Sequence, residues 1–152
     1  FGYGYLTKIP GTVTSLVTAV FIYIAYEHLG YTDLKFSIIF FTLLFFYSFY
    51  AVKDAESEFK NKDPRQIVID EVLGQAMPLI LVLHLSQDNQ LNLPIEVYYV
   101  LSFIFFRFFD ILKPFPVSYF DKNFKNYFGI IMDDIMAGLY SMLLIYLISL
   151  KF

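Results

Sequence analysis

The feature that most limits how this chain can fold is a series of five apolar stretches separated by short polar segments. They cover residues 9–26, 36–52, 72–87, 95–112 and 135–150. A helix needs about 20 residues, with about 17–25 tolerated, to cross the hydrocarbon layer of a bilayer. We expect the second and fifth stretches to span a membrane alone. We expect the others to span it with polar residues of one end in the headgroup layer.

Spanning segments of this kind are predicted to be helices, because the bilayer core has no water to satisfy an exposed backbone. The runs are continuously apolar rather than alternating, which argues against a transmembrane β-barrel. The composition agrees: 58% of the residues are hydrophobic and 16% are charged, too apolar for a soluble domain of this size. The predicted fold is therefore all-α, a polytopic integral membrane bundle of about five helices that forms a single domain over residues 1–152.

The distribution of Lys and Arg predicts the orientation of the bundle. With a cytoplasmic N-terminus and five crossings, eight cations fall on the cytoplasmic side and two on the other side. That bias fits the positive-inside rule. If the third stretch, which contains Gly74 and Pro78, does not cross, the later helices change direction. The eight are Lys8, Lys53, Lys60, Lys62, Arg65, Lys113, Lys122 and Lys125, and the two are Lys35 and Lys151.

The same topology brings the polar motifs of four distant segments to the cytoplasmic ends of the helices. Two of these motifs are the acidic pairs Asp70-Glu71 and Asp133-Asp134, which lie beside or within apolar runs. Carboxylates there are costly unless they are paired, metal-bound or hydrated. Either pair alone fits an ordinary helix start, where the macrodipole favours acids. In both cases a glycine follows one of the acids by four residues, and this repeated layout favours a functional interpretation.

The other two motifs could bind an anion. Arg107, Asp110 and Lys113 are spaced i, i+3, i+6 and form one slanted stripe on a helix. The stripe is either an internal ion pair with snorkelling cations or a cationic surface for a phosphate. Thr12 and Ser15 open the first helix, where hydroxyl groups and free amides favour an anion or serve only as a cap.

The charge balance of these motifs points to a metal ion. Together they contain five carboxylates against three nearby cations, Lys8, Arg107 and Lys113. An anionic lipid headgroup would be repelled unless Mg²⁺, which prefers carboxylate, water and phosphate oxygens, lay between them. The absence of cysteine excludes thiol chemistry and cysteine-ligated zinc. A net charge of −3 argues against a nucleic-acid partner. The residues therefore indicate metal-assisted phosphoryl chemistry on a membrane lipid.

Four motifs also resemble the phosphatidylglycerophosphatase A family over nearly the whole chain. They are KIPGT (8–12) with Ser15, IDEVLG (69–74), FRFFDILKPFP (106–116) and GIIMDDIMAG (129–138). The resemblance implies a Mg²⁺-dependent lipid phosphatase of the bacterial inner membrane with its active site facing the cytoplasm. It also implies the substrate, phosphatidylglycerophosphate, whose terminal phosphate monoester would be hydrolysed to give phosphatidylglycerol and inorganic phosphate.

On this hypothesis the acidic pairs bind Mg²⁺ and the cations and hydroxyl groups bind phosphate. A metal-activated water or a carboxylate that forms an aspartyl-phosphate attacks phosphorus, and the sequence leaves both routes open. The expected metal ligands are Asp70, Glu71, Asp133 and Asp134, with Asp110 as a further catalytic candidate. The expected phosphate-binding residues are Lys8, Thr12, Ser15, Arg107 and Lys113.

Three other classes of protein remain alternatives at this point. Another membrane lipid phosphotransferase would also use clustered acids and Mg²⁺, but the chain has no D-G-x-x-A-R spacing. A small ion-coupled transporter would place acids in mid-membrane and show inverted repeats, and no repeat is visible. A purely structural membrane subunit needs no matching acidic pairs. Release of phosphate from a short-chain lipid separates the phosphatase from all three.

Overall fold

The computed structural model describes residues 9–29, 33–58 and 67–151, and all regular structure within them is helical. This confirms the predicted all-α class. Five helices are long and one, α5, has seven residues. They are α1 (Pro10–Leu29), α2 (Leu34–Glu58), α3 (Ile69–Gln87), α4 (Ile95–Leu112), α5 (Val117–Asn123) and α6 (Tyr127–Lys151).

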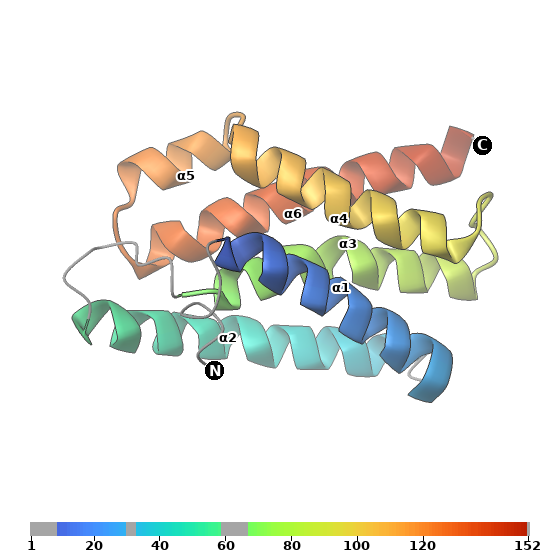
Figure 1. Ribbon diagram of the computed structural model, residues 1–152, viewed down its shortest axis with the longest axis horizontal. Coiled ribbons are helices and arrows are strands. Elements are labelled where there is room, and N and C mark those ends of the chain that lie inside the picture. The colour runs from blue at the N-terminus through green and yellow to red at the C-terminus, as the bar shows by residue number, and fades with distance from the viewer. Residues whose placement is uncertain (1–8, 30–32, 59–66, 152) are drawn as a thin grey trace.

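The long helices lie side by side and alternate in direction, so the bundle has two distinct ends (Figure 1). The first residues of α1, α3 and α6 and the last residues of α2 and α4 share one end, at the left of the figure. Helix α3 is central, because it packs against α1, α2, α4 and α6. The short helix α5 packs on α6 at the shared end. The predicted convergence of distant segments on one end is therefore present.

Within the described residues, three helices are long and apolar enough to cross a membrane: Leu34–Ala55 within α2, all of α3, and Tyr127–Leu150 within α6. This finding supports three of the five predicted spans. Helix α4 differs because Glu96, Arg107 and Asp110 interrupt its apolar sequence. Helix α1 begins with hydroxyl-bearing residues and has Glu27 and His28 near its end.

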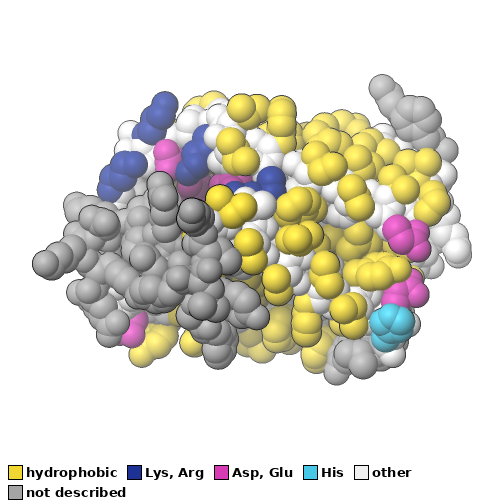
Figure 2. Space-filling view, viewed as in Figure 1, with side chains coloured by type: hydrophobic (Ala, Val, Ile, Leu, Met, Phe, Trp, Pro, Cys, Tyr) yellow, Lys and Arg dark blue, Asp and Glu magenta, His cyan; other side chains and the backbone are white. Residues whose placement is uncertain are grey.

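Apolar side chains that face outward fit contact with lipid rather than with water. Helix α2 is the clearest case, with Ile39, Phe40, Leu43 and Phe46 more than half exposed. Continuous apolar patches of this kind are rare on soluble monomers. In Figure 2 hydrophobic side chains cover the middle and right of the drawn face, Lys and Arg gather toward the left with acidic side chains beside them, and further acidic side chains lie with His at the right edge.

Helices α3 and α6 meet backbone to backbone at two glycines. A Cβ added to Gly138 would lie 2.6 Å from the carbonyl oxygen of Gly74. A Cβ added to Gly74 would lie 2.7 Å from the carbonyl oxygen of Asp134. Small residues allow such close approach between membrane helices. Because Asp70 and Asp134 each precede one of these glycines by one helical turn, the contact sets the two acids at the same level.

This packing predicts that a larger side chain at Gly138 destabilises the bundle. Gly138→Val should lower the free energy of unfolding by about 1–3 kcal/mol, because the new side chain must push α3 away from α6. Thermal unfolding in detergent measures the effect. Leu139→Val is the control, since Leu139 is 44% exposed and surface changes of this kind cost at most about 0.5 kcal/mol. Equal melting temperatures for the two variants would contradict the proposed contact.

Candidate active site

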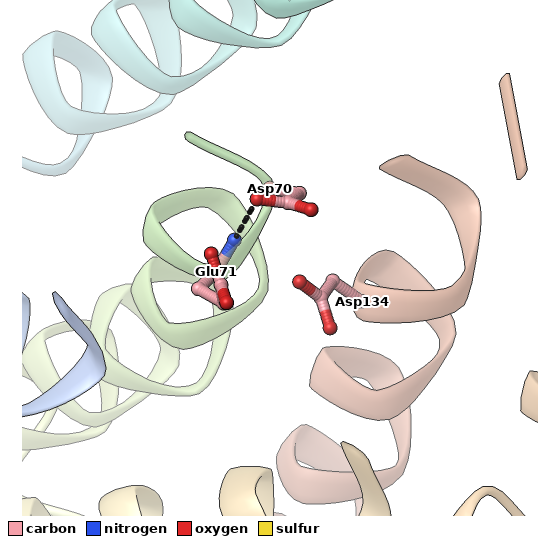
Figure 3. Close-up of side chains that lie close together, drawn as sticks. All are labelled: Asp70, Glu71 and Asp134. Carbon is pink, nitrogen blue, oxygen red and sulfur yellow. Dashed lines mark hydrogen bonds between the residues drawn. The ribbon is translucent and has the colours of Figure 1, made fainter. Parts of the chain in front are cut away.

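Three carboxylates from two helices meet at the shared end of the bundle. Asp70 and Glu71 begin α3, and Asp134 lies in the second turn of α6. One oxygen from each of the three lies within 4.8 Å of the others. Figure 3 shows the side chains of Asp70 and Asp134 on either side of one space, with Glu71 beside it. The predicted meeting of an acid from each pair is therefore observed.

The three acids are held in a mostly buried setting. Asp70 is 7% exposed and Asp134 is 4% exposed. The backbone N–H of Glu71 donates to Asp70 Oδ1 at 3.1 Å (Figure 3). Glu71 Oε2 is buried and has no hydrogen-bond partner among the described residues. A buried carboxylate oxygen without a partner is costly, so the group has an unmet need for a cation or a donor.

Helix α1 packs closely against Glu71 at Gly11. A Cβ at Gly11 would collide with Glu71 Oε1 and would lie 3.3 Å from Arg107 Nη1. The segment that opens α1 is therefore packed directly against the acid of α3 and the cation of α4. Only glycine allows this approach without displacing a charged side chain.

Asp133 lies next to Asp134 but has a different partner. Its Oδ2 lies 2.7 Å from Lys113 Nζ, and the same nitrogen lies 2.7 Å from Asp121 Oδ1. Sequence analysis predicted Asp133 as a metal ligand. The structure places it in an ion pair at the side of the three-carboxylate group rather than inside that group.

The Lys113–Asp121 pair is charged on both sides at neutral pH. Burial alone would lower the pKa of Lys113, but the carboxylates of Asp133 and Asp121 raise it above its usual value. Burial alone would raise the pKa of Asp121, but the hydrogen bond from Lys113 and its positive charge lower it below the usual value. Lys113 therefore presents a permanent positive charge beside the acids.

Arg107 is held by an acid and faces the first helix. Its Nη1 lies 2.7 Å from Asp110 Oδ2 and donates to Ser15 Oγ at 3.5 Å. Ser15 Oγ in turn donates to the carbonyl oxygen of Gly11 at 2.9 Å. The predicted Arg107–Asp110 pair and the predicted nearness of Ser15 are both present. Thr12 lies half-buried in the first turn of α1, and Lys8 lies outside the described residues.

A polar cavity of about 130 Å³ opens onto these groups. Six predicted site residues line it, while Arg107, Thr12 and Ser15 do not. Sequence analysis missed Asp121, Phe124 and Lys125, because residues 113–128 looked like a connection of mixed cations and aromatics. An acid on a short helix between two motifs was the available signal for Asp121. The lining residues are Asp70, Glu71, Asp110, Lys113, Asp121, Phe124, Lys125, Gly129, Ile130, Asp133 and Asp134.

Membrane-length helices around a buried carboxylate group and a polar cavity define a helical membrane protein with a site at one end of its bundle. The chain belongs to the phosphatidylglycerophosphatase A family, whose sequence model matches residues 1–149. The family predicted from the sequence motifs is confirmed, and membership of this family makes the chain a phosphatase.

Curated relatives carry two kinds of name. A Haemophilus influenzae protein named "Phosphatidylglycerophosphatase A" is 34% identical over 98% of this chain and 84% of its own. An Escherichia coli K12 protein of the same name is 28% identical over 98% of this chain and 79% of its own. A Bacteroides thetaiotaomicron protein named "Putative phosphatidylinositol-3-phosphatase" is 35% identical over 95% of this chain and 86% of its own. No solved structure gives a significant match.

The ion pair beside the acids predicts a pH-dependent coupling. A double-mutant cycle with Lys113→Gln and Asp121→Asn should give a coupling free energy of about 1 kcal/mol at pH 7. Because the pKa of Asp121 is lowered in the folded protein, this stabilisation is present above the unfolded pKa of about 3.9. It should be lost as the pH falls through the lowered value. Unfolding in detergent at several pH values measures it, and a coupling that grows toward acid pH would contradict the pair.

Proposed function

We propose that this chain hydrolyses the terminal phosphate monoester of phosphatidylglycerophosphate to give phosphatidylglycerol and inorganic phosphate. The observation that carries the proposal is the group formed by Asp70, Glu71 and Asp134, whose oxygens lie within 4.8 Å of one another beside a polar cavity. Family membership and the names of two relatives support the substrate. Lys113 lines the same cavity and adds positive charge where a phosphate would enter.

The residues of the cavity fit a magnesium ion. The donors are all carboxylate oxygens, which suit Mg²⁺. Three neighbouring carboxylates repel one another, and Glu71 Oε2 has no partner among the described residues. A divalent cation would offset the repulsion between the carboxylates and would give Glu71 Oε2 a partner. In this proposal Asp70, Glu71 and Asp134 hold the ion. Asp133 does not contact it and instead positions the ammonium group of Lys113.

The bound ion would supply a Lewis acid that polarises a phosphoryl oxygen and lowers the pKa of a water. The chain's own residues bind and orient the phosphate. Lys113 neutralises negative charge on the phosphoryl oxygens, and Asp133 and Asp121 hold its ammonium in place. Arg107, fixed by Asp110 and Ser15, adds positive charge behind Glu71.

The bond between phosphorus and the glycerol oxygen breaks in this reaction, and a new oxygen joins phosphorus in line with it. If water attacks, a carboxylate of the cavity accepts its proton and the leaving oxygen gains one. If Asp70 or Asp134 attacks instead, an aspartyl-phosphate forms and water hydrolyses it in a second step. Trapping a phosphoenzyme by acid quench distinguishes the two routes.

A second candidate substrate is phosphatidylinositol 3-phosphate. The relative with a phosphatidylinositol-3-phosphatase name is 35% identical over 95% of this chain. Both lipids contain a polyol with a phosphate monoester. In both, a phosphodiester joins this polyol to diacylglycerol. The acid group and Lys113 would contact the monoester, which both candidates share.

The proposed topology has five membrane-embedded helices in a single domain, with a cytoplasmic N-terminus and the cavity facing the cytoplasm of a bacterial inner membrane. The bias of eight cations to two supports this orientation. The alternating helices bring the acid group and Lys113 to one end of the bundle, which this orientation would set at the cytoplasmic face. In this topology helices α1 and α4 are the remaining two of the five membrane-embedded helices, and their polar ends lie in the headgroup layers.

The proposed activity predicts phosphate release that depends on the acid group. The purified protein should release inorganic phosphate from phosphatidylglycerophosphate in mixed micelles. Asp70→Asn and Asp134→Asn should each lower kcat by about 10²-fold or more, because each removes a carboxylate that would hold the divalent cation. Asp88→Asn, at an exposed acid of the other end, is the control. Near-normal turnover in both site variants would refute the assignment, and faster release from phosphatidylinositol 3-phosphate would favour the second substrate.

Metal removal gives a separate prediction. Treatment with a chelator should abolish phosphate release, and added Mg²⁺ should restore it, because the acid group without a cation repels an anionic substrate. Isothermal titration with Mg²⁺ alone should show binding to the wild type and weaker binding to Asp134→Asn. Full activity after exhaustive chelation would exclude the metal.

The topology can be tested with single cysteines, because the chain has none of its own. Gln90→Cys, between α3 and α4, should react with a membrane-impermeant maleimide in intact spheroplasts. Asn123→Cys, at the end of α5, should react only after permeabilisation. Both side chains are exposed in the structure. The reverse labelling pattern would show that the cavity faces outward.

A further inference from the structure

The rim of the cavity contains a cation that the proposed mechanism does not use. Most of the lining residues are buried or half-buried, and Lys125 is the exposed one. It lies in the short link between α5 and α6, next to Phe124. Asp70 and Asp134 are buried, so they lie deep in the site while Lys125 lies at its opening.

The charge of Lys125 is available to a ligand. Lys113 is engaged by Asp121 and Asp133, both at 2.7 Å, and Arg107 is engaged by Asp110 at 2.7 Å. No ion pair within the described ranges involves Lys125. Of the two lysines that line the cavity in the described part of the chain, Lys113 is shared between two carboxylates and Lys125 has no ion-pair partner.

An aromatic surface adjoins this cation. The ring of Phe124 lies 5.8 Å from that of Phe120 in a stacked arrangement and 5.5 Å from that of Phe128. The ring of Phe128 lies 6.2 Å from Phe49 of α2, so the aromatic surface runs from the rim toward the outer helix. A cation beside an apolar surface suits an anionic amphiphile, because the charge and the hydrocarbon part both find a partner.

The size of the cavity requires part of a lipid substrate to lie at this rim. A volume of about 130 Å³ is room for a hydrated phosphate group but not for a diacylglycerol. Both candidate lipids contain a second negative group, the phosphodiester, between the polyol and the diacylglycerol. When the monoester lies at the acid group, the phosphodiester lies outside, toward the rim.

We propose that Lys125 is a specificity-determining residue that binds the phosphodiester of the lipid substrate. The acid group and Lys113 hold the monoester, and the aromatic surface beside Phe124 packs against the apolar part of the lipid. This assignment rests on the proposed lipid phosphatase function. It explains how a small cavity would prefer a lipid with two phosphate groups over a simple phosphate monoester.

The test compares four proteins in nonionic micelles that contain phosphatidylglycerophosphate: wild type, Lys125→Gln, Lys125→Arg and Lys122→Gln. Lys125→Gln should raise KM about three- to tenfold, with kcat within about twofold, because the reacting phosphate is untouched. Lys125→Arg should keep KM near the wild-type value. Lys122→Gln removes an exposed cation of α5 that does not line the cavity, and it should leave KM unchanged. Inhibition by inorganic phosphate should be equal in all four.

Three results would overturn the assignment: an unchanged KM in Lys125→Gln, an equal rise in Lys122→Gln, or a loss of kcat without a rise in KM. If the wild type releases no phosphate from this lipid, the proposed function fails instead. The four proteins are then compared for equilibrium binding of phosphatidylglycerol, which contains the phosphodiester alone. Weaker binding by Lys125→Gln only would support Lys125 as a phosphodiester site, and equal affinities would refute it.

Discussion

The contact between α3 and α6 is the constraint on which the site depends. Bringing Asp70, Glu71 and Asp134 together in a buried place costs free energy through desolvation and mutual repulsion. The acids themselves provide nothing to offset this cost. The close approach of the helices at Gly74 and Gly138 holds the backbones together, one turn from the acids. Apolar packing of α3 against its four neighbouring helices then keeps the acid-bearing end fixed.

The charges around the cavity fall into two groups with different consequences. Lys113 and Arg107 are bound by Asp133, Asp121 and Asp110, so these pairs are satisfied within the protein. Asp70, Glu71 and Asp134 take part in none of the ion pairs found in the described part of the chain. The unsatisfied group is negative, although the proposed substrate is also negative. That conflict is the physical reason for proposing a divalent cation, and it makes Lys113 and Lys125 the residues that attract the lipid.

Hydropathy predicted the long helices well but predicted their ends poorly. The stretch 135–150 became α6, which begins at Tyr127, eight residues earlier. Hydropathy detects the part of a helix that lies in lipid, whereas polar turns beyond the bilayer continue the same helix without an apolar signal. Helix α5 was missed for the same reason, because its seven residues mix polar and apolar side chains.

The sequence by itself determined that the chain is helical, that its helices suit a membrane, and that its acidic pairs lie at one end of the bundle. These properties follow from apolar length and from the alternating direction of consecutive helices. Only the tertiary structure decided that both acids of the first pair join the acid group but only Asp134 of the second pair does. Successive residues of a helix point about 100° apart, so Asp134 faces the acids of α3 while Asp133 faces Lys113. The sequence could not show this difference, because it depends on how α6 is rotated against α3.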